Sequence, residues 1–323
     1  NGPENCIFIS DHEVFEFAES DGVDETDIIS GFTFKDMNTQ HVIFFHGDVL
    51  VSIDNCIFSN IVTSNGVIHL NSLNYSVGGV NISNCKFLNN VGRAINSSEV
   101  GTIESYIDNC LFYNNTEDAN DGGAIRSVLD LTITNSIFVK NIARYGGAIS
   151  HSTFLKPLAI GGCFFLDNES FDSDYSLGSA ITASGSTVQI YWSTFQGNDS
   201  LAVYLSGGDY WDIVNFNNFI DNSYAIFNSN NNSFLNAENN WWGHSTGPYH
   251  PTSNTGGQGD SVNIYVDVIP FLTEPDTVAP IPLIQNVSVD TFGIDYVDIF
   301  WDVSPIGDLA GYKVYLDSIA TDV

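Results

Sequence analysis

The chain has 323 residues, and 39 acidic against 8 basic side chains give a formal net charge of −31 at pH 7. Nucleic acids and anionic membranes bind through basic surfaces, so this balance argues against both as partners. No run of 18 apolar residues occurs, so no membrane-spanning helix is predicted. The acidic charge fits an extracellular protein, and it would equally keep a long β-rod soluble.

A short phrase recurs along the first two thirds of the chain. An aliphatic residue is followed three positions later by Cys or a small residue, then by Phe after two positions and Asn after three more. Clear copies are ISNCKFLNN at 82–90, IDNCLFYNN at 107–115, ITNSIFVKN at 133–141, IGGCFFLDN at 160–168 and IYWSTFQGN at 190–198. Successive copies lie 21 to 30 residues apart. This indicates a solenoid, because each repeat buries its apolar face only on its neighbours.

The apolar residues within each repeat alternate, which is the pattern of β-strands rather than helices. A second phrase, GGAI at 122–125 and 146–149, supplies a further strand. One coil would then hold strands at 131–135, 136–140 and 147–150. The sequence therefore predicts an all-β fold for residues 1–235, a right-handed parallel β-helix with three strands in each of about ten coils and a length of roughly 50 Å.

The Asn after each Phe is expected at one corner of successive coils. Asn tolerates the left-handed backbone of a sharp corner, and stacked amides can hydrogen-bond from coil to coil. We therefore predict a structural ladder of Asn90, Asn115, Asn141, Asn168, Asn198 and Asn222. The five cysteines share one inward repeat position and are expected to be buried free thiols.

The residues that flank each inward Phe should point outward from the same strand. In the middle of the solenoid this row is mostly apolar, and it gives a predicted partner-binding face of Ile57, Leu88, Leu111, Tyr113, Ile137, Val139, Phe164 and Leu166. Such a face exceeds the apolar area that soluble monomers usually expose, so we expect another copy, another part of the same chain or a partner to cover it. A register shifted by one residue would invert the faces.

Two groups of carboxylates fall on predicted corner loops. Glu117, Asp118 and Asp121 form the first, and Asp172 and Asp174 the second. Carboxylate oxygens are calcium ligands, so these loops are candidate Ca²⁺ sites, with solvated loop charges as the alternative. No other cofactor is expected.

An enzyme of the β-helix type is the main alternative to a binding role. Polysaccharide lyases need a base beside carboxylates, and glycosidases need paired carboxylates across a cleft. The only catalytic candidates are Asp209, Asp212 and Asp221 with Arg126. The Gly-His-Gly and Arg-Ile-Lys motifs of polygalacturonase-type glycosidases do not occur, so the sequence favours a non-catalytic protein.

The repeat stops near residue 236. Trp241 and Trp242 are suited to covering the last open coil, and an aromatic platform for carbohydrate is the alternative. Prolines that follow mark a linker. Residues 236–274 are therefore predicted to be the C-terminal cap and linker.

Residues 275–323 alternate as antiparallel strands do. Trp301 and GYKVY at 311–315 resemble the first strands of a fibronectin type III domain. Such a domain needs more residues than this segment holds, so a partial module is predicted, with further modules expected before and after the chain.

The pairing of Phe-X-X-Asn with GGAI, at 112–125 and 138–149, resembles the repeats of the chlamydial polymorphic outer-membrane adhesins. The NWWG segment and the tail look more like β-helix proteins secreted to the surface of environmental bacteria. These resemblances imply an extracellular module that attaches to copies of itself, to other surface proteins or to glycans. Because β-helix folds also host enzymes, a carbohydrate-active enzyme or carbohydrate-binding module stays the alternative.

Overall fold

The computed structural model describes residues 6–10, 12–18, 28–46, 50–71, 79–98, 104–153, 156–171, 178–207, 211–280, 288–292 and 297–300. The chain divides into two compact units, Asn1–Pro280 and Ile281–Val323. Every regular element within the described residues is a β-strand. No helix in that part of the chain could therefore cross a membrane.

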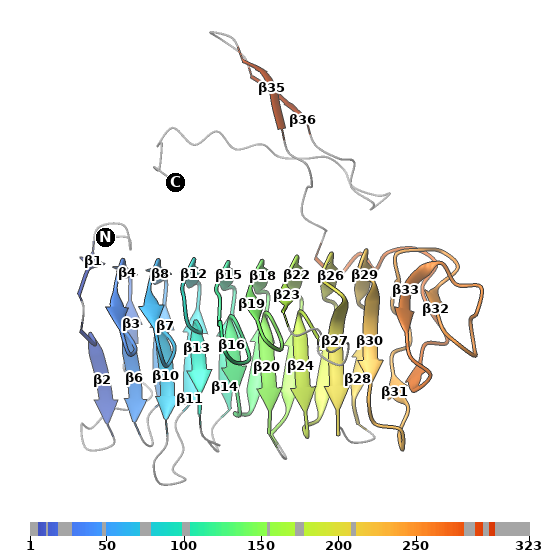
Figure 1. Cartoon of the computed structure of the whole chain (residues 1–323), viewed down its shortest axis with the longest axis horizontal. Helices are drawn as coiled ribbons and strands as arrows, with labels where there is room; N and C mark the ends of the chain where they lie inside the picture. Colours follow the sequence, from blue (N-terminus) through green and yellow to red (C-terminus); the bar gives the residue numbers. More distant parts are fainter. Residues whose placement is uncertain are drawn as a thin grey trace. The chain divides into compact units, whose positions relative to one another are not determined.

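The first unit is a parallel β-solenoid built from three long sheets, with coils stacked from the N-terminal to the C-terminal end (Figure 1). Sheet A is β1 (Ile7–Phe8), β4 (Thr33–Lys35), β8 (Ile57–Ser59), β12 (Lys86–Leu88), β15 (Leu111–Tyr113), β18 (Ile137–Val139), β22 (Phe164–Leu166), β26 (Thr194–Gln196) and β29 (Asn218–Ile220). Sheet B is β2 (Phe15–Ala18), β6 (Ile43–His46), β10 (Ile68–Asn71), β13 (Ile95–Ser97), β16 (Ile125–Ser127), β20 (Ile149–Ser152), β24 (Ile181–Ser184), β27 (Leu201–Ser206), β30 (Tyr224–Asn228), β33 (Gly259–Val262) and β32 (Pro248–Tyr249). Sheet C is β3 (Ile28–Ser30), β7 (Leu50–Asp54), β11 (Gly79–Ser83), β14 (Ser105–Asp108), β17 (Leu131–Thr134), β21 (Leu158–Gly161), β25 (Val188–Tyr191), β28 (Ile213–Asn215), β31 (Leu235–Asn236) and β34 (Val266–Asp267).

Short pairs extend the corner between sheets A and B. They are β5 (Asn38–Thr39) with β9 (Val62–Thr63) and β19 (Ile142–Ala143) with β23 (Glu169–Ser170). In the second unit, β35 (Ser288–Phe292) pairs antiparallel with β36 (Val297–Phe300). The expected fibronectin type III module has most of its residues outside the described ranges and stays a prediction.

The parallel solenoid and its three strands per coil were predicted from the repeat, but the coil count differs from ten. Complete coils run only from β3–β4–β6 to β28–β29–β30, and partial coils lie at both ends. The predicted strands of one coil are also too long, since β17 ends at Thr134 and β18 begins at Ile137. The intervening Asn135 has a φ of 50° and turns the corner, so it cannot belong to either strand.

A column of stacked aromatic rings runs through the core. Its members are Phe8, Phe34, Phe58, Phe87, Phe112, Phe138, Phe165, Phe195, Phe219 and Trp242. From Phe34 onward the ring centroids are 4.7 to 5.0 Å apart. This spacing matches the distance of about 4.8 Å between hydrogen-bonded strands, so one Phe per coil stacks without shifting the sheet register. The rigid stack fixes which side chains face inward.

The C-terminal end of the core is closed by the predicted cap. Trp242 is fully buried and stacks on Phe219, while Trp241 is half-buried and forms a β-bridge with Asn218. Trp242 therefore ends the aromatic column instead of forming an exposed platform for carbohydrate.

Residues 271–280 then turn back across the outer face of sheet A, and we call this segment the strap. The Leu272 N–H donates to the Asn240 carbonyl. Further along, Asp276 and Asn218 exchange two hydrogen bonds of 2.8 and 3.0 Å. At the far end Thr194 donates to the Pro280 carbonyl at 2.7 Å. The strap thus lies over β29 and β26 and belongs to the solenoid unit.

Candidate functional site

The six predicted ladder asparagines form a continuous buried ladder at the corner between sheets A and B. The side-chain amide of each of the first five donates to the next asparagine at 2.8 to 3.0 Å. Each also donates to the carbonyl of the Phe in the preceding coil, as Asn141 does to Phe112. The first, Asn90, accepts from the backbone of Ile61, and the last, Asn222, donates to Asp260. The ladder therefore links the coils and leaves no amide for a ligand.

The ladder asparagines do not themselves take the left-handed backbone that the sequence pattern indicated. That conformation belongs to the residue before each of them, as at Asn89, Asn114 and Lys140, where φ is 52° to 54°. The ladder Asn can point inward because its neighbour turns the chain. Lys140 shows that the turning position does not require Asn.

Asp260 ends the ladder with a carboxylate in place of an amide. Its Oδ2 accepts from the backbone and the side chain of Asn222, at 3.0 and 2.8 Å. Burial raises the pKa of Asp260 to about 7, an effect that these hydrogen bonds oppose and the nearby Asp221 reinforces. This end of the ladder therefore titrates near neutral pH.

The cysteines are free thiols, and four of them are buried at the inward repeat position. Burial raises the pKa of Cys163 to about 12. The hydrogen bond with Cys85, together with burial, raises the pKa of Cys56. Thiols that stay protonated and buried are poor nucleophiles and metal ligands, so these residues act as small core side chains.

Two of the first group of candidate calcium ligands, Glu117 and Asp121, form ion pairs with arginine side chains. Arg93 lies 3.5 Å from Glu117 and 3.3 Å from Asp121, and Arg126 lies 3.3 Å from Asp121. Asp118 is exposed. These contacts use carboxylate oxygens that a calcium ion would need. Asp172 and Asp174 lie outside the described residues, and within the described ranges no group of three His, Cys, Asp or Glu side chains could hold a metal.

The described catalytic candidates are not brought together. Asp212 precedes β28, and its carboxylate accepts from the Val188 N–H at 2.9 Å. Asp221 is an exposed corner residue after β29, with a φ of 56°. Arg126 lies in β16 on sheet B, several coils away. Asp209 falls outside the described residues, and the three candidates that are described share no site.

The predicted partner-binding face is divided into an exposed and a buried part. Tyr113 and Ile137 are exposed, at 38% and 36%. Val139, Phe164 and Leu166 are buried and form a small cluster separate from the main core, so this part of the face is covered. The remaining members, Ile57, Leu88 and Leu111, are half-buried.

The strap explains why the outer face of sheet A is buried toward its C-terminal end. Thr194 and Asn218, which bond to the strap, are fully buried although they point away from the core. Gln196 and Ile220 on the same strands are at most 7% exposed. A segment of the same chain was one of the covers expected from the sequence, and the strap fills that role over β26 and β29.

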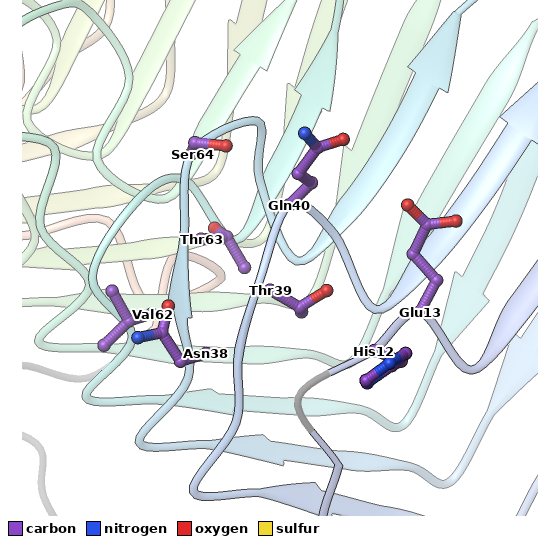
Figure 2. A pocket seen from close by; sticks show the side chains of 8 residues that line it. All are labelled: His12, Glu13, Asn38, Thr39, Gln40, Val62, Thr63 and Ser64. Atoms are coloured by element: carbon purple, nitrogen blue, oxygen red, sulfur yellow. The ribbon is translucent and has the colours of Figure 1, made fainter.

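A surface pocket of about 790 Å³ lies near the N-terminal end, at the corner that carries β5 and β9. It is lined by His12, Glu13, Asn38, Thr39, Gln40, Val62, Thr63 and Ser64. Figure 2 shows His12 and Glu13 on one side, Val62 to Ser64 on the other, and Asn38 to Gln40 between them. The lining offers hydroxyl and amide groups for a polar ligand.

A histidine pair lies behind this pocket. Glu13 Oε1 is 2.9 Å from Nε2 of the buried His41, whose ring centroid lies 5.7 Å from that of His69. Burial, with the charges of His41, Arg93 and Arg126, lowers the pKa of His69 to about 4. The neutral His69 and the His41–Glu13 contact fix the wall of the pocket and supply no nucleophile–base pair.

Sequence reasoning missed two aromatic residues at the corner between sheets C and A. Trp192 and Phe216 occupy the position just before the Cys position, where the other four clear repeats have Asn or Gly. The departure from that pattern was the available signal.

Comparisons of the chain with protein-family models, with curated proteins and with solved structures found no match. The residues and their geometry alone therefore carry the functional argument.

Proposed function

We propose that the solenoid is a non-catalytic structural or adhesive module of an extracellular surface protein. It associates with a second copy of itself through the exposed part of the outer face of sheet A, from β8 to β18. The same face could equally serve for attachment to another surface protein.

The observation that carries this proposal is the uncovered apolar face beside the strap. Tyr113 and Ile137 are exposed next to a buried cluster on the same sheet. Apolar side chains in a contiguous row favour association, because burying them releases ordered water. The strap supports this use, since the same face already packs against an extended segment over the adjacent coils.

Charge favours this face for contact between copies. Two chains that each carry −31 repel one another through most of their surface. The outward positions of β12, β15 and β18 hold one charged side chain, Lys86, and it is basic. Copies can approach there without bringing carboxylates together.

The test is the particle mass of the purified chain, measured by light scattering at two protein concentrations. We expect a dimer or larger assembly for the native sequence and a monomer for Ile137→Asp with an unchanged circular dichroism spectrum. Phe234→Asp, an exposed aromatic outside sheet A, is the matched control and should leave the assembly intact. A native chain that is monomeric at both concentrations, or an assembly that Ile137→Asp leaves unchanged, would contradict the proposal.

A carbohydrate-active enzyme is less well supported, because Asp212, Asp221 and Arg126 lie on different sheets and corners. A carbohydrate-binding role has a separate observation in its favour, the exposed aromatic corner.

A further inference from the structure

The corner between sheets C and A is turned in each coil by one residue with positive φ. From Asn55 onward these residues are Asn55, Asn84, Asn109, Asn135, Gly162, Trp192, Phe216 and Asn239, with φ between 48° and 64°. Asn and Gly adopt this left-handed conformation readily, whereas bulky side chains do so only under strain. Two adjacent coils therefore place large aromatic residues where the backbone disfavours them.

The strained pair is not used to build the core. Trp192 is 45% exposed and Phe216 is half-buried. The aromatic column is continued in these coils by Phe195 and Phe219, which are fully buried. Asn or Gly would relieve the strain at both positions, and packing does not require the aromatic rings there. Backbone strain of this kind is characteristic of functional sites.

The exposed rings are arranged as a surface. Trp192 and Phe216 stack with centroids 6.4 Å apart and planes inclined by 23°. The ring of Tyr191 lies 5.6 Å from Trp192. We call Tyr191, Trp192 and Phe216 the aromatic corner. The two stacked rings follow one another along the solenoid axis, as the coils that carry them do.

Polar groups border the aromatic corner. Asn215 pairs with Tyr191 across strands β28 and β25, and its buried Oδ1 has no hydrogen-bond partner. Asn239, half-buried, holds the same corner position in the next coil. Gly162 holds it in the preceding coil and adds no side chain. Amides beside exposed rings are suited to a ligand that combines hydroxyl groups with an apolar face.

Sugars have this combination, since the C–H groups of a pyranose form an apolar face and its hydroxyls project from the rim. The corner positions on both sides, Gly162 and Asn239, are uncharged. A chain with a net charge of −31 would repel an anionic glycan at long range. We propose that the aromatic corner binds a neutral polysaccharide, with the sugar rings stacked on Trp192 and Phe216.

The test uses the full chain with soluble neutral glucans and mannans, and with polygalacturonate as the charged comparison, in affinity electrophoresis and titration calorimetry. Trp192→Asn restores the residue type that other coils carry at this position, so it should fold with a melting temperature no lower than that of the native chain. We expect it to weaken binding of the neutral polysaccharide at least tenfold. Trp211→Asn removes a more exposed tryptophan before β28 and should leave the affinity unchanged.

Three outcomes would overturn the proposal. They are a native chain that binds none of the neutral polysaccharides, a Trp192→Asn variant that binds as the native chain does, and equal losses in the Trp192 and Trp211 variants. The assembly test on Ile137 is independent, because that residue lies on sheet A two coils before Trp192 and is not part of the aromatic corner.

Discussion

Two corners of the same coil are built from the same backbone conformation but carry different side chains. Where sheet A meets sheet B, a turning residue is followed by an inward Asn, and six of these asparagines form a buried ladder. Where sheet C meets sheet A, the turning side chain itself projects outward, and Asn, Gly, Trp and Phe all occur there. Side chains link coils at the second corner too, as Asn109 does by donating to Asn84, but these hydrogen bonds are exposed whereas those of the ladder are buried. A solenoid corner therefore accepts varied residues where its side chain is not a buried hydrogen-bonding link between coils.

The largest expected effect comes from breaking the ladder in its middle. The Asn141 side chain makes four hydrogen bonds. Its Oδ1 accepts from the backbone N–H and the side-chain amide of Asn115, and its Nδ2 donates to the Phe112 carbonyl and to Asn168 Oδ1. At about 1 kcal/mol for each, Asn141→Ala should lower the free energy of unfolding by about 4 kcal/mol. Urea unfolding followed by circular dichroism measures this loss. Asn135→Gly, at the other corner of the same coil, is the matched control: it removes one exposed hydrogen bond to Asp108 and should change stability by about 1 kcal/mol at most.

Asp260 should make the ladder end sensitive to pH. Its pKa is raised from 3.8 to about 7 in the folded chain, so the folded state holds this proton more tightly than the unfolded state does. The resulting stability is fully present below about pH 4 and is lost as pH rises through about 7. At 1.36 kcal/mol per pKa unit, discounted for partial exposure, the loss is about 3 kcal/mol.

Asp260→Asn supplies a neutral side chain at every pH. We expect the variant to remove this part of the pH dependence and to be more stable than the native chain at pH 8. Thermal unfolding of both proteins between pH 4 and 8 measures the difference. Parallel pH curves for the two proteins would show that Asp260 does not titrate in this range.

The smallest effect is expected at the aromatic corner, and it has the opposite sign. Trp192→Asn exchanges a strained aromatic for a residue that tolerates positive φ. The relief is about 1 kcal/mol, less what the ring gains by packing on Tyr191 and Phe216. Urea unfolding should therefore place the variant at or slightly above the native stability. A clear loss would mean that the aromatic corner is a packing feature.

The local repeat was enough to predict the parallel strands, the inward Phe and the Asn ladder. Each depends on a residue type at a fixed spacing, and neighbouring coils repeat the same contact. The sequence did not indicate which residue turns each corner, because Asn89 and Asn90 are the same residue type in adjacent positions. Only the backbone angles distinguish them.

The strap, and the burial that it causes on sheet A, could not be predicted from the repeat. Asp276 meets Asn218 across 58 residues of chain, and no periodic pattern links them. The burial of Gln196 and Ile220 beneath it could not be predicted from alternation alone, since alternation gives the side of a sheet but not what covers it. Trp192 and Phe216 were visible in the sequence as departures from the Asn or Gly of other repeats, and their exposure became clear only in the structure.

The most direct test of this account is the free energy of unfolding of Asn141→Ala and Trp192→Asn, measured side by side in urea at pH 7. The account predicts a loss of about 4 kcal/mol for the first and no loss for the second. Similar losses for both would contradict the division between a corner that holds the coils together and a corner that is free to bind.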